Sequence, residues 1–87
     1  MDEIECILGS RGKLRILRVI YGLGEANITR IVKETRMNHK LVSRHIRTLV
    51  EMGILNEKVF GRVKIYSINF ANPKTLLLKD VFTLMEE

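Results

Sequence analysis

The sequence is poor in the residues that build cross-links and metal clusters. It has one cysteine, Cys6, one proline, Pro73, and no tryptophan. A single cysteine excludes an intramolecular disulfide and a multi-cysteine metal cluster. No apolar run reaches the roughly 18 residues of a transmembrane helix, and the acidic start, residues 1–5, lacks the basic and apolar segments of a signal peptide. These absences predict a cytoplasmic protein.

The sequence also lacks any visible catalytic arrangement. It shows no set of nucleophile, base and acid, no phosphate-binding glycine loop and no metal-ligand spacing. His39 and His45 are six residues apart, so they face different directions on a helix, without cysteine or carboxylate partners. The chain is therefore expected not to be an enzyme and to need no metal or other cofactor.

What the sequence does have is basic charge, gathered in its middle. The 87 residues include 15 Lys and Arg against 10 Asp and Glu, a net charge of +5. Seven of the ten acids lie near the ends or in linking segments, whereas nine Lys or Arg and only three Glu lie between Thr29 and Lys64. Such a concentration of positive charge in a small domain favours a nucleic-acid partner.

The periodicity predicts a single domain over residues 1–87, mainly α-helical with a small β-hairpin (α+β). A helix over 13–21 is capped by Ser10 and stopped by Gly22 and Gly24, and residues 26–28 form a short extended link. A second helix, capped by Thr29 or Asn27, runs to about residue 35. After a tight turn at 36–38, a third helix runs from the cap Asn38 to about residue 52 and ends at Gly53.

Beyond Gly53 the pattern changes to that of strands. Residues 54–60 and 63–68 are rich in Val, Ile, Phe and Tyr. Gly61-Arg62 between them is the signature of a type II′ turn, so a β-hairpin with a basic tip is predicted. A helix-turn-helix followed by a hairpin is the winged helix-turn-helix layout, here with extra N- and C-terminal helices.

The two terminal helices are predicted to hold two copies together. Pro73 opens a final helix over 74–85 with more apolar residues than one face can hold. We expect a homodimer in which the ends, 1–9 and 73–87, carry the interface through Ile4, Ile7, Leu8, Leu77, Val81, Leu84 and Met85. A membrane-surface helix is disfavoured by its low basic content. Cys6 is favoured as a small buried apolar residue over an intersubunit disulfide or a redox switch.

The third helix separates into an apolar and a polar side. Val42, Ile46, Leu49 and Met52 share one side, and the polar side is predicted to enter the major groove of double-stranded DNA. The wing, 58–64, would lie on flanking backbone or minor groove. The candidate DNA-binding residues are Asn38, His39, Lys40, Ser43, Arg44, Arg47, Arg62, Lys64, Thr29 and Arg30.

Plainer interpretations stand beside these. The polar side of the third helix could be an ordinary solvated face, and lysines on an exposed hairpin also block edge pairing. For Lys58, Lys64, Arg30 and Lys33, contact with DNA and simple solvation are equally favoured. His45 falls near the apolar stripe and is expected to pack rather than to touch DNA.

Residues 37–55, MNHKLVSRHIRTLVEMGIL, resemble the recognition-helix signature of the ArsR-like (arsenical-resistance-type) regulators of prokaryotes. Ser43, His45, Ile46, Leu49 and Gly53 fill the places of that signature, and residues 13–20 resemble the first core helix; the resemblance covers roughly residues 10–70. It implies a homodimeric, operator-binding transcription regulator. Many relatives sense metals through paired cysteines near the recognition helix, and this chain has none there, so metal sensing is not expected.

Two other functions share some of these features. An architectural or chromatin protein would coat DNA without sequence preference and carry the same basic surface. A winged helix used as a protein-interaction module would bind no DNA, but it has no need of a basic helix and a basic wing together. Sequence-specific regulation is therefore the favoured prediction.

Overall fold

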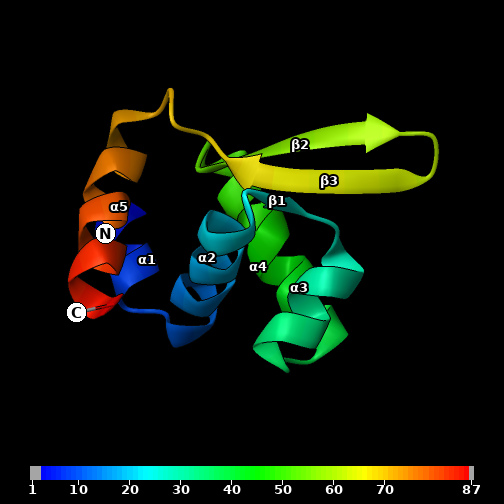
Figure 1. The fold of residues 1–87 in the computed structure, drawn as a ribbon, viewed down its shortest axis with the longest axis horizontal. Coiled ribbons are helices and arrows are strands. Elements are labelled where there is room, and N and C mark those ends of the chain that lie inside the picture. Colours follow the sequence, from blue (N-terminus) through cyan, green and yellow to red (C-terminus); the bar gives the residue numbers. More distant parts are fainter. Residues whose placement is uncertain (1–2, 87) are drawn as a thin grey trace.

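The computed structural model describes residues 3–86 and the side chains of residues 5–84. Helices α2, α3 and α4 pack below a small sheet whose hairpin extends away from the body (Figure 1). Helices α1 and α5 lie together at the opposite end, near both termini. Within the described part the order is α1 (Glu3–Leu8), α2 (Arg11–Leu23), β1 (Glu25–Ala26), α3 (Ile28–Thr35), α4 (His39–Glu51), β2 (Leu55–Phe60), β3 (Val63–Ile68) and α5 (Pro73–Glu86). The predicted winged helix-turn-helix with extra terminal helices is confirmed.

Helix α2 begins where the sequence predicts a cap and ends one glycine later than expected. The Ser10 side chain accepts a hydrogen bond of 3.2 Å from the backbone N–H of Lys13. Gly22 lies inside the helix, so its prediction as a stop is wrong. Gly24 ends the helix at φ 85°, a positive φ that glycine adopts with little strain. A glycine therefore ends this helix where the backbone takes a positive φ, as at Gly24, and its mere presence, as at Gly22, does not.

The link predicted at residues 26–28 is in part a strand. Glu25 and Ala26 form β1, which pairs antiparallel with Ser67 and Tyr66 of β3, so the sheet has the order β1-β3-β2 within the described chain. Two residues are too few to predict a strand from their sequence, and Glu25 and Ala26 form one because they pair with β3. This third strand anchors the base of the hairpin and leaves the outer half of β3 without a neighbour on that side.

The core lies between the helices and the inner face of the sheet. It takes apolar residues from every helix and from all three strands, and burial of each large side chain stabilises the fold by roughly 1.5–3 kcal/mol. The rings of Tyr21 of α2 and Phe82 of α5 contact each other at a tilt of 41°, with centroids 5.8 Å apart. The buried members are Ile7, Ile16, Leu17, Ile20, Ala26, Ile31, Val42, Ile46, Leu49, Ile54, Leu55, Tyr66, Ile68, Leu78 and Phe82.

A polar loop, residues 69–72, joins β3 to α5 and is hydrogen-bonded to the end of α4. The Gly53 carbonyl accepts hydrogen bonds from the side-chain amides of Asn69, at 2.8 Å, and Asn72, at 3.1 Å. The buried Thr75 hydroxyl donates to the carbonyls of Asn72 and Asn69. These bonds fix the position of α5 relative to the end of α4. No helix in the described chain is long and apolar enough to cross a membrane.

Candidate nucleic-acid interface

The polar side of helix α4 faces solvent because the Asn38 cap fixes where the helix begins and the core buries its apolar side. The Asn38 side-chain oxygen accepts hydrogen bonds from the backbone N–H groups of Lys40, at 2.8 Å, and Leu41, at 3.3 Å, which satisfies free donors of the first turn. Val42, Ile46 and Leu49 are buried as predicted, while Met52, predicted beside them, is only half-buried at the C-cap. The opposite side carries His39, Lys40, Arg44 and Arg47, all exposed, and the half-buried Ser43.

A left-handed residue sets the turn between α3 and α4. Arg36, at φ 58°, is the one non-glycine residue with positive φ among those described. The buried Thr35 hydroxyl donates to the Ile31 carbonyl at 2.7 Å and accepts from the Met37 N–H at 3.3 Å. Sequence reasoning overlooked Thr35, although a threonine at the last residue of a helix, facing the apolar side, is a usable signal. The turn makes α4 cross α3 as a helix-turn-helix requires.

A close contact with α2 holds the middle of α4. A Cβ placed on Gly12 would lie 2.7 Å from His45 Nε2 and 3.1 Å from Met37 Cε, so any other residue there would force these side chains to move. His45 is half-buried there, which confirms the expectation that it packs. Burial lowers the pKa of His45 below its ordinary value, and the positive charges of Lys13 and Arg44 lower it further. His45 is therefore a neutral packing residue at neutral pH.

The wing is a regular hairpin with a cationic tip. Gly61 has φ 61° and Arg62 is not in the positive-φ region, as a type II′ turn requires. Lys58, Arg62 and Lys64 are all exposed. No acidic residue occurs between residues 58 and 64. The tip therefore carries positive charge only.

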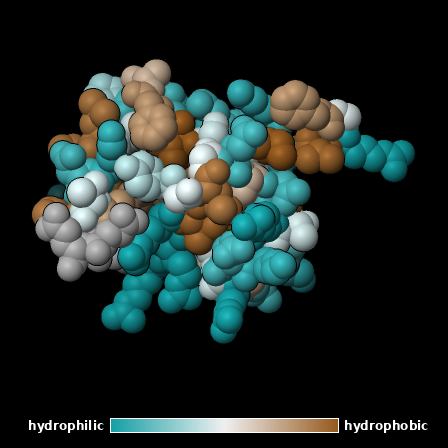
Figure 2. Space-filling view, viewed as in Figure 1, coloured by the Kyte–Doolittle hydropathy of each residue, from teal (hydrophilic) through white to brown (hydrophobic). Residues whose placement is uncertain are grey.

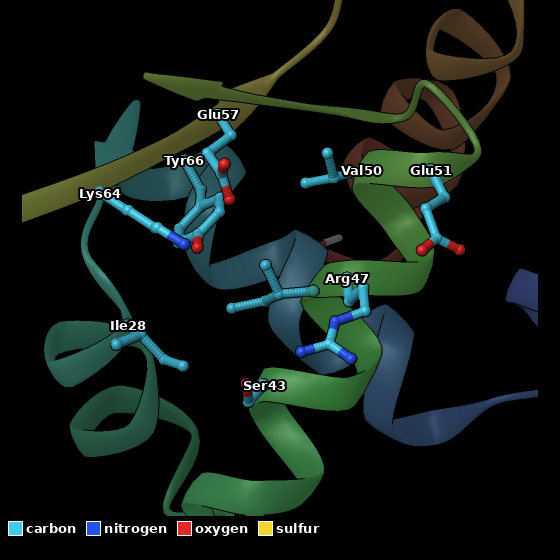
Figure 3. Close-up of a pocket in the computed structure, with 9 residues that line it drawn as sticks. Ile28, Ser43, Arg47, Val50, Glu51, Glu57, Lys64 and Tyr66 are labelled. Atoms are coloured by element: carbon cyan, nitrogen blue, oxygen red, sulfur yellow. The ribbon is translucent and has the colours of Figure 1, made fainter. Parts of the chain in front are cut away.

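An open cavity of about 400 Å³ separates α4 from the wing. In Figure 3, Arg47 extends from α4 and Lys64 extends from β3 toward this space, beside the hydroxyl of Tyr66. Burial and a hydrogen bond with Glu57 raise the pKa of Tyr66 to about 12, so the phenol stays protonated. The lining residues are Ile28, Ser43, Ile46, Arg47, Val50, Glu51, Glu57, Lys64 and Tyr66.

A second concavity, of about 340 Å³, joins the first residues of α3 to the wing. It brings Thr29, Ser43, Arg62 and Lys64 around one surface, although they come from three separate segments. Arg30 does not reach it, because it lines a different concavity and its Nε donates to Glu34 Oε1 at 2.9 Å. Sequence reasoning overlooked Glu57 and Tyr66, yet the two-residue turn alone fixes them as a cross-strand pair.

The predicted dimer residues divide into exposed and buried groups. Leu8, Leu77 and Leu84 are 45%, 58% and 70% exposed, and Val81 is half-buried. Ile7 is fully buried within its own chain, so its side chain belongs to the core and not to a free surface. Ile4 and Met85 lie in α1 and α5, but their side chains fall outside the described residues. Leu77, Val81 and Leu84 follow the i, i+4, i+7 spacing of one helix face.

Cys6 is half-buried on α1 and forms no disulfide. Among the described residues, no group of three or more His, Cys, Asp or Glu is placed to hold a metal ion.

Comparisons with known proteins give a family match and several solved structures with the same fold. The model of the family described as bacterial regulatory protein, arsR family, matches residues 10–57, which span α2 through the start of β2. No curated protein sequence matches the chain.

Several solved structures share the fold. The AntR antimony-specific transcriptional repressor is 23% identical with a TM-score of 0.79, over 95% of this chain and 74% of that one. The transcriptional repressor PagR of Bacillus anthracis is 24% identical with a TM-score of 0.75, over 95% and 88%. A homodimeric winged helix-turn-helix DNA-binding domain from Mycobacterium bovis is 23% identical with a TM-score of 0.78, over 97% and 76%. At these identities the similarity shows the fold.

Proposed function

Because the chain belongs to the arsR family of bacterial regulatory proteins, we propose that it is a homodimeric transcription regulator that recognises a specific double-stranded DNA sequence. The matched family is one of regulatory proteins, and the structural neighbours with this fold are described as a transcriptional repressor and a DNA-binding domain. The observation that carries the proposal is that Arg47 of α4 and Lys64 of the wing line one cavity, while Arg62 lines a second concavity that also includes Lys64.

The polar side of α4 is proposed to read bases in the major groove. An α-helix fits that groove, and arginine recognises guanine through two parallel hydrogen bonds. His39, Lys40, Ser43 and Arg44 lie toward the N-terminal half of α4, the part that approaches base edges in helix-turn-helix proteins. Asn38 has its side-chain oxygen engaged in capping, so only its amide N–H groups are available to DNA.

One DNA strand is proposed to pass between α4 and the wing. Arg47 and Lys64 face the same cavity from its two sides, which suits contact with successive phosphates. Arg62 and Thr29 extend this contact along the second concavity. Arg30 contributes less, because its guanidinium is held by Glu34.

Two copies are proposed to associate through α1 and α5. The exposed Leu8, Leu77 and Leu84 lie on these helices, which sit together at the end of the molecule away from the wing tip (Figure 1). A two-fold dimer would place two α4 helices about 34 Å apart, one turn of DNA, and so would read a pseudo-palindrome.

Selection of bound sequences from a random duplex pool tests this function, followed by gel-shift titration of the selected duplex. We expect a palindromic consensus, and Arg44→Ala or Arg47→Ala should weaken binding about tenfold or more. Arg18→Ala is the matched control, because Arg18 is exposed on α2 and lines neither concavity.

Other results of these experiments would support a different function. Binding without a consensus would indicate an architectural protein, and absence of salt-sensitive binding would indicate a protein-interaction module. Equal affinity of wild type, Arg44→Ala and Arg47→Ala would contradict the assignment of α4 as the reading helix.

A further inference from the structure

The tip of the wing carries large apolar side chains that the proposed DNA contacts do not use. Phe60, Val59 and Val63 are 63%, 60% and 47% exposed. Figure 2 shows hydrophobic colour along the protruding hairpin, ending at a hydrophilic tip. A group of exposed apolar residues on a small domain marks an interaction site.

The hairpin register decides where these residues point. Phe60 pairs with Val63, so the two side chains flank the Gly61-Arg62 turn on one face of the hairpin. Val59 pairs with Lys64 and lies on the other face, the face that carries the buried Tyr66. The tip is therefore apolar on both faces, and Arg62 stands at its end.

Charge and position indicate what this tip touches. Every charged residue from 58 to 64 is a cation, which suits a polyanion. Arg62 and Val63 line the same concavity as Ser43 of α4, so the tip continues the proposed DNA surface. A second copy of the chain fits less well, because the exposed leucines of α1 and α5 lie at the opposite end (Figure 1).

We propose that the wing tip enters the minor groove of the bound duplex, where Phe60 acts as an apolar wedge that partly unstacks one base step and bends the DNA. The inference rests on the proposed function and adds to it a second mode of recognition. Arg62 lies in the groove, whose negative potential attracts arginine, and Val63 packs against the sugars. Inserted Phe side chains bend duplexes by roughly 20–90° in proteins that bind the minor groove.

A wedge of this kind gives sequence preference without hydrogen bonds to bases. Pyrimidine–purine steps such as TA and CA open easily, whereas runs of adenine are stiff. The selected DNA is therefore expected to carry a flexible step where the wing reaches it, outside the bases that α4 contacts.

The test uses the full chain and an end-labelled duplex of the selected sequence, with the bend measured by energy transfer between the duplex ends. Phe60→Ala is expected to lose most of the bend and to bind about tenfold more weakly. Phe60→Leu keeps an apolar wedge and should retain the bend. Phe70→Ala is the matched control, because Phe70 is 54% exposed but lies in the turn before α5.

A second experiment uses a duplex in which the flexible base step is replaced by a run of adenines. Wild type should lose affinity for this duplex relative to the parent sequence, and Phe60→Ala should not discriminate between the two. Circular dichroism of each variant checks that the fold is kept, as the exposure of Phe60 leads us to expect.

Several results would overturn the proposal. The wedge proposal would be contradicted if wild type bound DNA without bending it, or if Phe60→Ala bent DNA as wild type does. In either case, binding that still depends on Arg44 would leave the proposed function standing. A change of oligomeric state in Phe60→Ala would assign the tip to contacts between copies. Failure of wild type to bind any duplex would overturn both proposals.

Discussion

The absence of a Cβ at Gly12 leaves space beside α2 for the side chains of His45 and Met37. Gly12 faces the His45 ring and the Met37 methyl group, and an added Cβ would be 2.7 Å from the nearest ring atom. Gly22 lies in the same helix with no atom of another residue near its Cβ position. The two glycines are therefore equivalent in helix propensity and differ in packing.

This difference predicts opposite effects of alanine at the two positions. Gly22→Ala should stabilise the protein by roughly 0.5–1 kcal/mol through helix propensity. Gly12→Ala gains the same stabilisation from helix propensity, but it forces the His45 side chain to move, which costs about 1–3 kcal/mol. Gly12→Ala should therefore be less stable than Gly22→Ala. Urea unfolding measures both, and Gly12→Ala with His45→Ala should recover part of the loss. Equal stability of the two single variants would contradict the close contact.

His45 also predicts how stability depends on pH. Its folded pKa is lowered by burial, Lys13 and Arg44, so the unfolded chain takes up the proton at a higher pH than the folded chain does. Stability is therefore lost as the pH falls through the ordinary value of 6.5 toward the folded value, and it is unaffected above 6.5. Thermal unfolding between roughly pH 8 and pH 5 should show a smaller fall for His45→Asn than for wild type. His39→Asn, on the exposed side of α4, should behave as wild type.

At the scale of elements, α4 and the wing act as two arms around one space. Each is rigid by itself: α4 through its Asn38 cap and buried stripe, the hairpin through its type II′ turn and the β1 pairing. Under the proposed function, a DNA strand in this space would need both arms, because Arg47 and Lys64 come from different arms.

Salt dependence measures the contribution of the wing. Each lysine or arginine that neutralises a phosphate adds about one to the slope of log affinity against log salt concentration. Arg62→Ala and Lys64→Ala should each lower that slope by about one, measured by fluorescence anisotropy over a salt series. Lys79→Ala, exposed on α5, removes the same charge far along the chain and should leave the slope unchanged. An unchanged slope in both wing variants would exclude phosphate contact by the wing.

At the scale of the whole molecule, the wing tip and the helices α1 and α5 lie at opposite ends (Figure 1). The loop before α5 is hydrogen-bonded to the end of α4, because the side-chain amides of Asn69 and Asn72 donate to the Gly53 carbonyl. In a dimer built on α5, this loop would set the spacing and orientation of the two α4 helices.

Charge placed on α5 should separate the copies without unfolding them. Leu77→Glu and Leu84→Glu put carboxylates on exposed positions, so the monomer fold should survive while the dimer is lost. Sedimentation equilibrium should show a monomer, and affinity for the full palindrome should fall to that of a half-site. Leu23→Glu, 41% exposed at the end of α2, is the matched control and should stay dimeric. Monomeric wild type at micromolar concentration would remove the homodimer proposal.

The sequence by itself determined what depends on neighbours along the chain. The caps at Ser10 and Asn38, the buried stripe of α4 and the turn at Gly61-Arg62 are local, because each needs residues within about one helical turn or one hairpin. The cationic character of residues 29–64 is likewise a property of composition.

Only the tertiary structure decided what depends on segments that meet in space. The β1 strand exists because β3 pairs with it, and Ile7 is a core residue because α1 packs against its own chain. Arg47 and Lys64 face each other across one cavity because of how the helices cross and the strands twist. Periodicity gives the face of an element but not the element that it meets, since that choice is made by packing over the whole molecule.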